Sequence, residues 1–275
     1  MNTKKKVIIL SVFFALAISL VLYPFFANIH NEKLAQELIV EYEENISELE
    51  EEAIEELLEE AQIWNSALYA ASGGNYFSEE LSREEIYESL LNIYGDGMMG
   101  YIVIPDIDVE LPIYHYTSDE VLSKGVGHIE TTSLPVGGEG SHCVLTAHRG
   151  LPGSRLFTDL DQLEEGDVFY LEILGETLAY EVISIEIVEP EDTQSLAAVS
   201  GEDLCTLVTC TPYGINSHRL LVTGKRIDYE ETLEEYENGT YESDYSPDFT
   251  LLYVGYMELI IYFLVLNRIR RKRRS

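Results

Sequence analysis

A series of short apolar runs between Gly100 and Arg226 constrains the fold of this chain more than any other feature. The runs are rich in β-branched residues, and turn signals such as Gly137-Gly138 and Glu165-Gly166 separate them. Several short strands at such spacing are typical of a β-sandwich or a β-barrel. The pattern therefore predicts a mainly β domain with strands over residues 101–104, 109–113, 143–147, 168–174, 178–188, 204–210 and 219–226.

The last two runs predict a β-hairpin that carries reactive groups. Cys210 ends the first run, a Thr-Pro-Tyr-Gly turn follows, and Arg219 lies on the returning strand. A thiolate is the reactive form of cysteine, and a nearby cation favours it. The same cation can stabilise the oxyanion of an acyl-transfer intermediate. His148, after the apolar run that begins at Cys143, supplies an imidazole, which completes the parts that a covalent thiol acyl-transferase needs.

The other two cysteines are expected to be inert thiols of the core. Cys205 and Cys210 are separated by an odd number of residues, so in a regular strand they face opposite sides of the sheet. Cys210 ends its strand beside a Pro/Gly turn, where exposure is expected, whereas Cys205 and Cys143 lie inside apolar runs. Three cysteines cannot build a disulfide framework, and no histidines accompany them at zinc-ligand spacing. We therefore expect neither a metal nor a cofactor.

Other histidines and arginines compete for the same roles. His142 is expected to be a hydrogen-bonding residue near the start of its strand, and His218, adjacent to Arg219, points to the opposite face. Arg149 competes with Arg219 as the cation. A surface pair with a carboxylate is the alternative role of Arg219 itself. Two further histidines are assigned no chemistry and are expected only to help shape the cleft: His115 and His128.

Several motifs, in the same order along the chain, resemble those of the sortases, the membrane-anchored cysteine transpeptidases of Gram-positive bacteria. The catalytic positions of that family match Cys210 in Leu-Val-Thr-Cys, His148 in Thr-Ala-His-Arg-Gly and Arg219 in His-Arg-Leu-Leu-Val. The likeness extends over residues 87–228 and is closest to the class C branch, whose members polymerise pilins. It includes Gly-Asp-Gly-Met-Met-Gly-Tyr-Ile-Val-Ile-Pro from Gly95, Leu-Pro-Ile-Tyr-His from Leu111, Gly-Val-Gly-His from Gly125, Ser-Leu-Pro-Val-Gly-Gly from Ser133 and Arg-Gly-Leu-Pro from Arg149. The resemblance implies a closed eight-stranded sortase-type β-barrel.

The resemblance also implies a mechanism. The Cys210 thiolate attacks the Thr carbonyl of a Leu-Pro-x-Thr-Gly-like sorting signal, and Arg219 stabilises the oxyanion. His148 protonates the departing glycine amine and then deprotonates the incoming amine. The implied partners are pilins or surface proteins with C-terminal sorting signals. The implied acceptor is a pilin lysine amine, with cell-wall peptide as the alternative.

Three alternatives remain open at this point. A wall-anchoring sortase joins a surface protein to peptidoglycan rather than to another pilin. A thiol protease delivers the acyl group to water. A catalytically silent membrane scaffold uses an acidic helix to bind partners, and activity in a Cys210→Ala variant would favour it.

One departure from the class C pattern concerns the lid. These enzymes carry an Asp-Pro-aromatic motif in a segment upstream of the barrel, where it covers the cysteine. Residues 64–94 of this chain contain no proline. The nearest equivalent is Gly-Gly-Asn-Tyr-Phe, which makes Tyr76 and Phe77 the candidate lid residues.

Charge is divided sharply along the chain, whose formal net charge is −33. All acidic residues except Glu258 lie within residues 27–249, whereas basic residues cluster in 4–6 and 268–274. An acidic domain of this kind excludes nucleic-acid binding, because affinity for nucleic acid comes from neutralising phosphates. The charge keeps an exterior domain soluble, or attracts partners that bear lysine.

Both ends of the chain carry apolar segments that predict membrane helices. Residues 7–26 follow three lysines and are long enough to span a bilayer. A cleaved signal peptide is the alternative, but the Ala15-x-Ala17 site lies inside the apolar run, so a retained signal-anchor is favoured. Residues 250–266 are apolar except for Glu258, and the basic tail after them indicates a second span. Both termini are then cytoplasmic, and the catalytic domain is outside the plasma membrane of a Gram-positive bacterium.

The predicted organisation has five parts. Residues 1–27 form the signal-anchor, 28–95 an acidic amphipathic helical segment with the candidate lid, 96–228 the catalytic barrel, 229–249 an acidic tether, and 250–275 the second membrane helix with its basic tail. Apolar residues at intervals of three and four predict one amphipathic helix from Leu34 to Trp64. A shorter helix is predicted over residues 82–93, because Ser82 and Glu85 fit a capping box.

Overall fold

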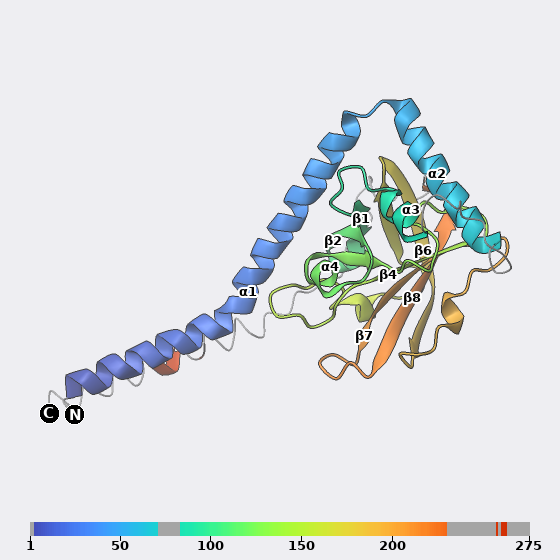
Figure 1. The fold of residues 1–275 in the computed structure, drawn as a ribbon. Helices are drawn as coiled ribbons and strands as arrows, with labels where there is room; N and C mark the ends of the chain where they lie inside the picture. Colours follow the sequence, from blue (N-terminus) through green and yellow to red (C-terminus); the bar gives the residue numbers. More distant parts are fainter. Residues whose placement is uncertain (1–2, 71–82, 230–256, 258–259, 263–275) are drawn as a thin grey trace.

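Eight strands close into a barrel in the computed structural model, which describes residues 3–70, 83–229, 257 and 260–262 (Figure 1). Around the barrel the strands follow the order β1-β2-β3-β4-β7-β8-β6-β5. The pairs β2–β3 and β4–β7 are parallel, and the other pairs are antiparallel. The strands are β1 (Met98–Ile104), β2 (Val109–His115), β3 (Val126–His128), β4 (Ser141–Thr146), β5 (Val168–Ile173), β6 (Glu176–Val188), β7 (Asp203–Thr211) and β8 (His218–Ile227). The predicted closed eight-stranded barrel is confirmed.

Seven strands coincide with the predicted apolar runs to within a few residues, and β3 is the one that the pattern of residues did not predict. Its three residues are too few to show a period of two. It forms because it pairs with β2 on one side and with β4 on the other. Short helical turns lie in the connections: η2 (Pro105–Ile107), α4 (Asp119–Lys124), η3 (Leu160–Gln162) and η4 (Gln194–Leu196).

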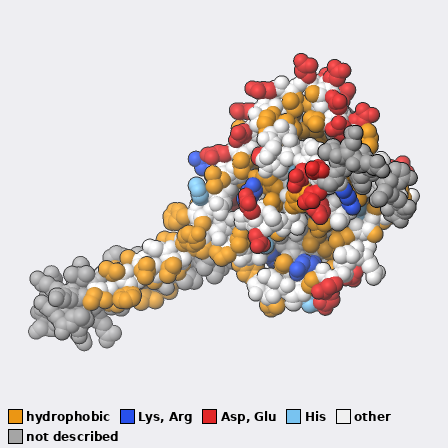
Figure 2. All heavy atoms as spheres, viewed as in Figure 1, with side chains coloured by type: hydrophobic (Ala, Val, Ile, Leu, Met, Phe, Trp, Pro, Cys, Tyr) orange, Lys and Arg blue, Asp and Glu red, His pale blue; other side chains and the backbone are white. Residues whose placement is uncertain are grey.

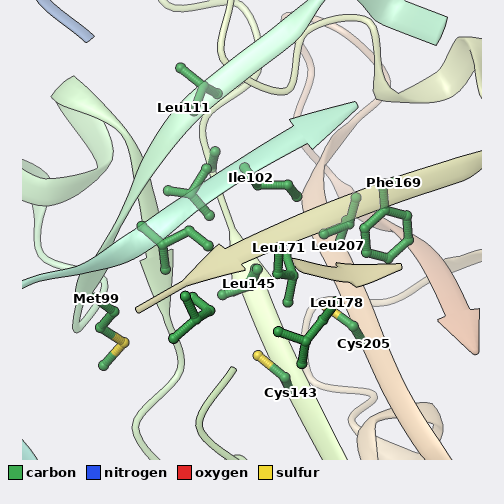
Figure 3. Close-up of a cluster of buried hydrophobic side chains, with 14 of the residues drawn as sticks. Met99, Ile102, Leu111, Cys143, Leu145, Phe169, Leu171, Leu178, Cys205 and Leu207 are labelled. Atoms are coloured by element: carbon green, nitrogen blue, oxygen red, sulfur yellow. The ribbon is translucent and has the colours of Figure 1, made fainter. Parts of the chain in front are cut away.

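Apolar side chains from most of the strands fill the barrel, as Figure 3 shows for one cluster. Ile102, Leu145 and Leu207 are fully buried there. In β8, a Cβ atom on Gly224 would lie 2.5 Å from a ring carbon of Phe169. The absence of a side chain at Gly224 therefore lets the Phe169 ring stack on Tyr180, with 5.5 Å between the ring centroids.

Two long helices, α1 (Thr3–Ser47) and α2 (Glu51–Ala70), lie outside the barrel and meet at a sharp turn (Figure 1). The prediction of one helix from Leu34 to Trp64 is therefore wrong. A single straight helix would leave one of its halves out of contact with the barrel. Glutamates four residues apart around the α1–α2 turn also repel one another, which disfavours a continuous helix there. The turn lets both helices bury apolar side chains against the barrel: Ile39, Tyr42 and Ile46 from α1, and Ala61 and Trp64 from α2.

The third helix before the barrel, α3 (Arg83–Ser89), is shorter than predicted. The predicted cap Ser82 lies outside the described residues. Tyr87 of α3 is buried, and its ring packs 6.0 Å from that of Trp64 in α2, measured between centroids. The contact holds α2 and α3 together on the barrel wall.

The N-terminal part of α1 is apolar and leads away from the barrel, and it is the one described helix long and apolar enough to cross a membrane. Figure 2 shows hydrophobic side chains over this part and acidic side chains around the α1–α2 turn. The helix continues through Pro24, so the predicted boundary at residue 27 is not a break in the helix. Tyr262 of the C-terminal segment contacts α1: its ring stacks on Phe14 at 4.1 Å, and its hydroxyl oxygen lies 2.8 Å from Ser11 Oγ. Most of the predicted second span, nearly all of the tether and the candidate lid lie outside the described residues.

Candidate active site

The β7–β8 hairpin places Cys210 directly opposite Arg219 in the antiparallel ladder. The two residues are the next-to-last pair before the turn, and Thr211 pairs with His218 beyond them. Both Cys210 and Arg219 are half-buried. Arg219 Nη1 donates to the carbonyl oxygens of His218 at 3.1 Å and Asn216 at 3.4 Å. These bonds fix the guanidinium at the turn end of β8, the strand that pairs with Cys210.

His148 reaches the same rim from the other side of β7. Strand β4 runs parallel to β7, and their last ladder pair is Thr146 with Val208. The pairing continues for one residue, because the Ala147 amide donates to the Val208 carbonyl at 3.2 Å and Thr209 Oγ1 donates to the Ala147 carbonyl at 2.9 Å. Since both strands advance together, His148 comes level with Cys210. The structure thus brings Cys210, Arg219 and His148 to one end of three neighbouring strands.

The thiol of Cys210 and the ring of His148 have no hydrogen-bond partner among the described residues. Both side chains are half-buried, so they remain accessible from outside the barrel. His142, on the same strand as His148, is different. Its Nδ1 donates to the Ala197 carbonyl at 3.0 Å, and its Nε2 accepts from Thr206 Oγ1 at 2.7 Å. Burial lowers the pKa of His142, so this ring is a neutral structural group, as the pattern of residues predicted.

Arg149 makes two structural contacts, although the pattern of residues presented it only as a competitor of Arg219. Its side chain is 7% exposed and forms an ion pair with Asp161 in η3. Its Nη1 donates to Thr211 Oγ1 at 3.2 Å. Arg149 therefore ties the loop after His148 to the strand that carries Cys210. No local pattern links Arg149 to Asp161, so the sequence held no signal for this role.

His115 and His128 do not shape the cleft, contrary to expectation. Both are buried beneath α3. The Tyr87 hydroxyl donates to His128 Nδ1 at 2.7 Å, and His128 Nε2 donates to the Ser133 carbonyl at 2.8 Å. His115 Nε2 lies 3.0 Å from the Tyr87 carbonyl oxygen, and burial lowers the pKa of His115. Both rings instead fasten α3 to the barrel.

The remaining candidates are placed as follows. His218 Nε2 lies 3.3 Å from Glu189 Oε1, in the loop after β6. Cys205 and Cys143 are opposite each other in the β7–β4 ladder and are buried inside the barrel (Figure 3). The candidate lid residues Tyr76 and Phe77 lie outside the described residues.

Comparison with known proteins identifies the family of this barrel. The sortase domain model matches residues 102–227. Sortase D of Bacillus subtilis is 32% identical over 131 residues, which are 46% of this chain and 63% of that protein. Sortase A of Streptococcus agalactiae is 29% identical over 136 residues, 48% of this chain and 55% of that protein. The chain thus spans between half and two thirds of the length of these curated relatives.

Solved structures cover more of the chain. Sortase C1 from Streptococcus agalactiae superposes with a TM-score of 0.65 at 44% identity, over 70% of this chain and 98% of that one. A Clostridium perfringens sortase C, solved with the C-terminal cell wall sorting motif, superposes with a TM-score of 0.62 at 44% identity, over 70% of this chain and 100% of that one. The chain belongs to the sortase family of cysteine transpeptidases. These structural neighbours place it in the class C branch.

Proposed function

We propose that this chain cleaves a Leu-Pro-x-Thr-Gly-like sorting signal between Thr and Gly and transfers the acyl group to a pilin lysine amine. The observation that carries the proposal is the cross-strand pairing of Cys210 with Arg219, with His148 level with them on the far side of β7. A thiol, a guanidinium and an imidazole at one exposed rim are the groups that acyl transfer through a thioester requires. The sortase C of Streptococcus pneumoniae, whose crystal structure gave insights into pilin substrate specificity, is 46% identical to this chain, and this likeness supports the choice of acceptor.

In the first half-reaction, the proton of the Cys210 thiol passes to His148, and the resulting thiolate attacks the carbonyl carbon of the Thr residue. The guanidinium of Arg219 stabilises the negative oxygen of the tetrahedral intermediate. When the intermediate collapses, the carbon–nitrogen bond breaks, and His148 gives its proton to the departing glycine amine. The product is a thioester between Thr and Cys210.

In the second half-reaction, a lysine amine attacks the thioester carbonyl. His148 takes the proton that the amine loses, and the carbon–sulfur bond breaks to release the Cys210 thiolate. The new bond is an isopeptide bond between the Thr carbonyl and the lysine nitrogen. The acidic domain favours an acceptor of this kind, because a lysine side chain is attracted to a negatively charged surface.

We also propose that α1 anchors the enzyme in the plasma membrane of a Gram-positive bacterium, with the catalytic domain outside. The apolar N-terminal part of α1 supports the first span. The contacts of Tyr262 with Ser11 and Phe14 support a second span that lies beside it. With basic residues at both ends of the chain, both termini are then cytoplasmic.

The test uses the full chain in detergent with a sorting-signal peptide, with and without a lysine-bearing pilin peptide. We expect a new conjugate that requires the lysine amine, and none from Cys210→Ala. A pilin peptide with that lysine replaced by arginine is the matched control. Conjugation only to a cell-wall peptide amine would assign the enzyme to wall anchoring. Hydrolysis of the peptide with no conjugate to any added amine would make the chain a thiol protease. Full activity in Cys210→Ala would refute the mechanism.

A further inference from the structure

The turn between β7 and β8 is unusual for a surface loop of this chain. Residues 212–217 contain no charged side chain, although charged residues make up 24% of the sequence. Two large side chains of the turn point outward: Tyr213 is 60% exposed and Ile215 is 72% exposed. Apolar groups of this size gain free energy on leaving water, so both side chains are available to contact an apolar partner surface.

The position of the turn indicates what that partner is. Tyr213 lines a cavity of about 750 Å³ together with Val21, Leu22 and Phe25 of α1. These three residues belong to the apolar stretch 7–26 that we propose to span the membrane. The turn therefore faces the end of the anchor that leaves the bilayer.

Close contacts hold α1 and the barrel in this arrangement. Asn31 Nδ2 donates to the Gly153 carbonyl at 2.7 Å and lies 2.8 Å from Ser154 Oγ, and the Arg155 amide donates to Asn28 Oδ1 at 2.9 Å. A Cβ atom on Gly153 would lie 2.6 Å from that of Ala27, so the Gly153 backbone packs directly against the Ala27 methyl group. The barrel is thus fixed to α1 within one turn of the end of the apolar stretch.

Helix length then sets the height of the turn above the bilayer. An apolar helix of 20 residues spans about 30 Å, the thickness of the hydrocarbon layer. With the lysines before it in the cytoplasm, Val21 and Phe25 lie in the outer leaflet, and the cavity opens at the level of the lipid headgroups. Tyrosine is enriched at that depth, and an apolar side chain such as Ile215 gains free energy there by leaving water. Four carboxylates line the cavity. Asp161 is paired with Arg149, and Asp159 and Asp108 with Arg155, while Glu32 accepts a hydrogen bond from Asn28 Nδ2 at 2.7 Å.

We propose that the β7–β8 turn, through Tyr213 and Ile215, inserts into the headgroup region of the outer leaflet beside α1. The turn joins the strands that carry Cys210 and Arg219, so the insertion holds the active site at the membrane surface. This proposal rests on the proposed anchoring by α1, and it adds a second membrane contact made by the catalytic domain itself.

The test measures depth with tryptophan fluorescence, using the full chain in phosphatidylcholine vesicles with brominated acyl chains. Ile215→Trp is the probe at the turn. Val199→Trp is the matched control, since Val199 is also an exposed apolar residue but precedes the opposite end of β7. Leu16→Trp in α1 reports the anchor. The signal of the native Trp64, which is buried, is subtracted from each variant.

We expect Leu16→Trp and Ile215→Trp to lose emission in brominated vesicles, and Val199→Trp to keep it. Quenching at Leu16→Trp without quenching at Ile215→Trp would overturn the contact at the turn and leave the anchor intact. No quenching at Leu16→Trp would overturn the proposed anchoring, and the turn proposal with it. Both readouts are independent of catalysis, so neither outcome bears on the chemistry of Cys210.

A charge at the turn gives a second test. Ile215→Asp should slow cleavage of a sorting-signal peptide tethered to a lipid and leave cleavage of the same free peptide unchanged. Ile215→Asn separates the loss of apolar surface from the added charge and should have the smaller effect. Equal losses on tethered and free peptide would assign Ile215 to the peptide site and refute the membrane contact.

Discussion

The two ends of the β4–β7 strand pair carry the same residue types, histidine and cysteine, in different environments. At the start of the pair, His142 and Cys143 lie opposite Leu204 and Cys205, and the cysteines and the histidine are buried. At the other end, His148 and Cys210 are half-buried, and no described residue hydrogen-bonds to the imidazole or the thiol. The comparison shows that position along the strand pair, rather than residue type, decides which of these groups remain accessible.

The physical cause is burial together with hydrogen bonding. Burial raises the pKa of the Cys205 thiol well above its usual value, so this sulfur stays protonated and unreactive. Both ring nitrogens of His142 are engaged, and burial lowers its pKa, so it cannot act as a proton carrier. At the rim, the half-buried Cys210 is accessible from outside the barrel, and Arg219 is its partner in the ladder.

The largest expected effect comes from removing the thiol at the rim. Cys210→Ala should lower the rate of peptide cleavage by at least about a thousandfold, since removal of a nucleophile eliminates the covalent path. Cys205→Ala and Cys143→Ala, at the buried end, should keep most of the activity. The measurement is kcat/KM on a sorting-signal peptide. If the variant of a buried cysteine stays folded but loses as much activity as Cys210→Ala, the two ends of the strand pair do not differ in reactivity as we propose.

The next effect concerns the cation opposite the thiol. Arg219→Lys should lower kcat by roughly 100- to 1,000-fold, about 2.7–4 kcal/mol, because a point ammonium does not reproduce the planar fork that faces the oxyanion. Arg226→Lys, at the far end of the same strand, is the matched control and should leave kcat unchanged. A fall in thermal stability with less than a tenfold change in kcat would make Arg219 a structural residue.

Chemical labelling sharpens the comparison without any substitution in the chain. In the native chain, iodoacetamide should modify Cys210 alone, because Cys143 and Cys205 are 1% and 0% exposed. All three thiols should react after unfolding in guanidinium. Mass spectrometry of peptides from the two conditions identifies the modified positions. Native labelling of Cys205 at a rate similar to that of Cys210 would show that the barrel opens.

A smaller effect is expected from the candidate lid. If Tyr76 and Phe77 cover the thiol, the double variant Tyr76→Ala/Phe77→Ala should speed the alkylation of Cys210 modestly, because the Asp and Pro of the family motif are missing. Tyr69→Ala, in α2, is a control for the loss of a nearby aromatic ring. Equal alkylation rates in the native chain and the double variant would show that the segment is no lid and that the rim is open to substrate.

The smallest effect is a pH dependence of stability from the buried end. The pKa of His142 is lowered by burial from its ordinary value of 6.5, so folding favours the neutral ring. Its contribution is full above about pH 6.5 and is lost as the pH falls below that value, because the unfolded chain then takes up the proton first. His142→Gln should therefore flatten the fall in Tm between pH 7 and pH 5. A fall of the same size in both proteins would show that other groups cause it.

Much of the catalytic hairpin could be predicted from the sequence because its determinants are local. The apolar run that ends at Cys210, the Pro/Gly turn and the return to Arg219 lie within one short segment, so strand alternation and turn length suffice to pair them. The same holds for the separation of Cys205 from Cys210, which follows from the two-residue period of a strand. The role of His148 beside Cys210 and the closure of the strands into a barrel were predicted from the family resemblance rather than from the pattern of residues.

Only the tertiary structure decided the features that depend on distant partners. Strand β3 is recognisable only once β2 and β4 flank it, and the helix break after Ser47 follows from where the barrel surface lies. The ion pair of Arg149 with Asp161 and the network of Tyr87 with His128 and His115 join segments with no shared local pattern. By itself, the sequence determined seven of the eight strands, the apolar N-terminal part of α1 and the cross-strand pairing of Cys210 with Arg219, since these depend on neighbouring residues. The parallel pairing of β4 with β7 brought His148 to Cys210, because a parallel pair needs a long crossover that local periodicity does not specify.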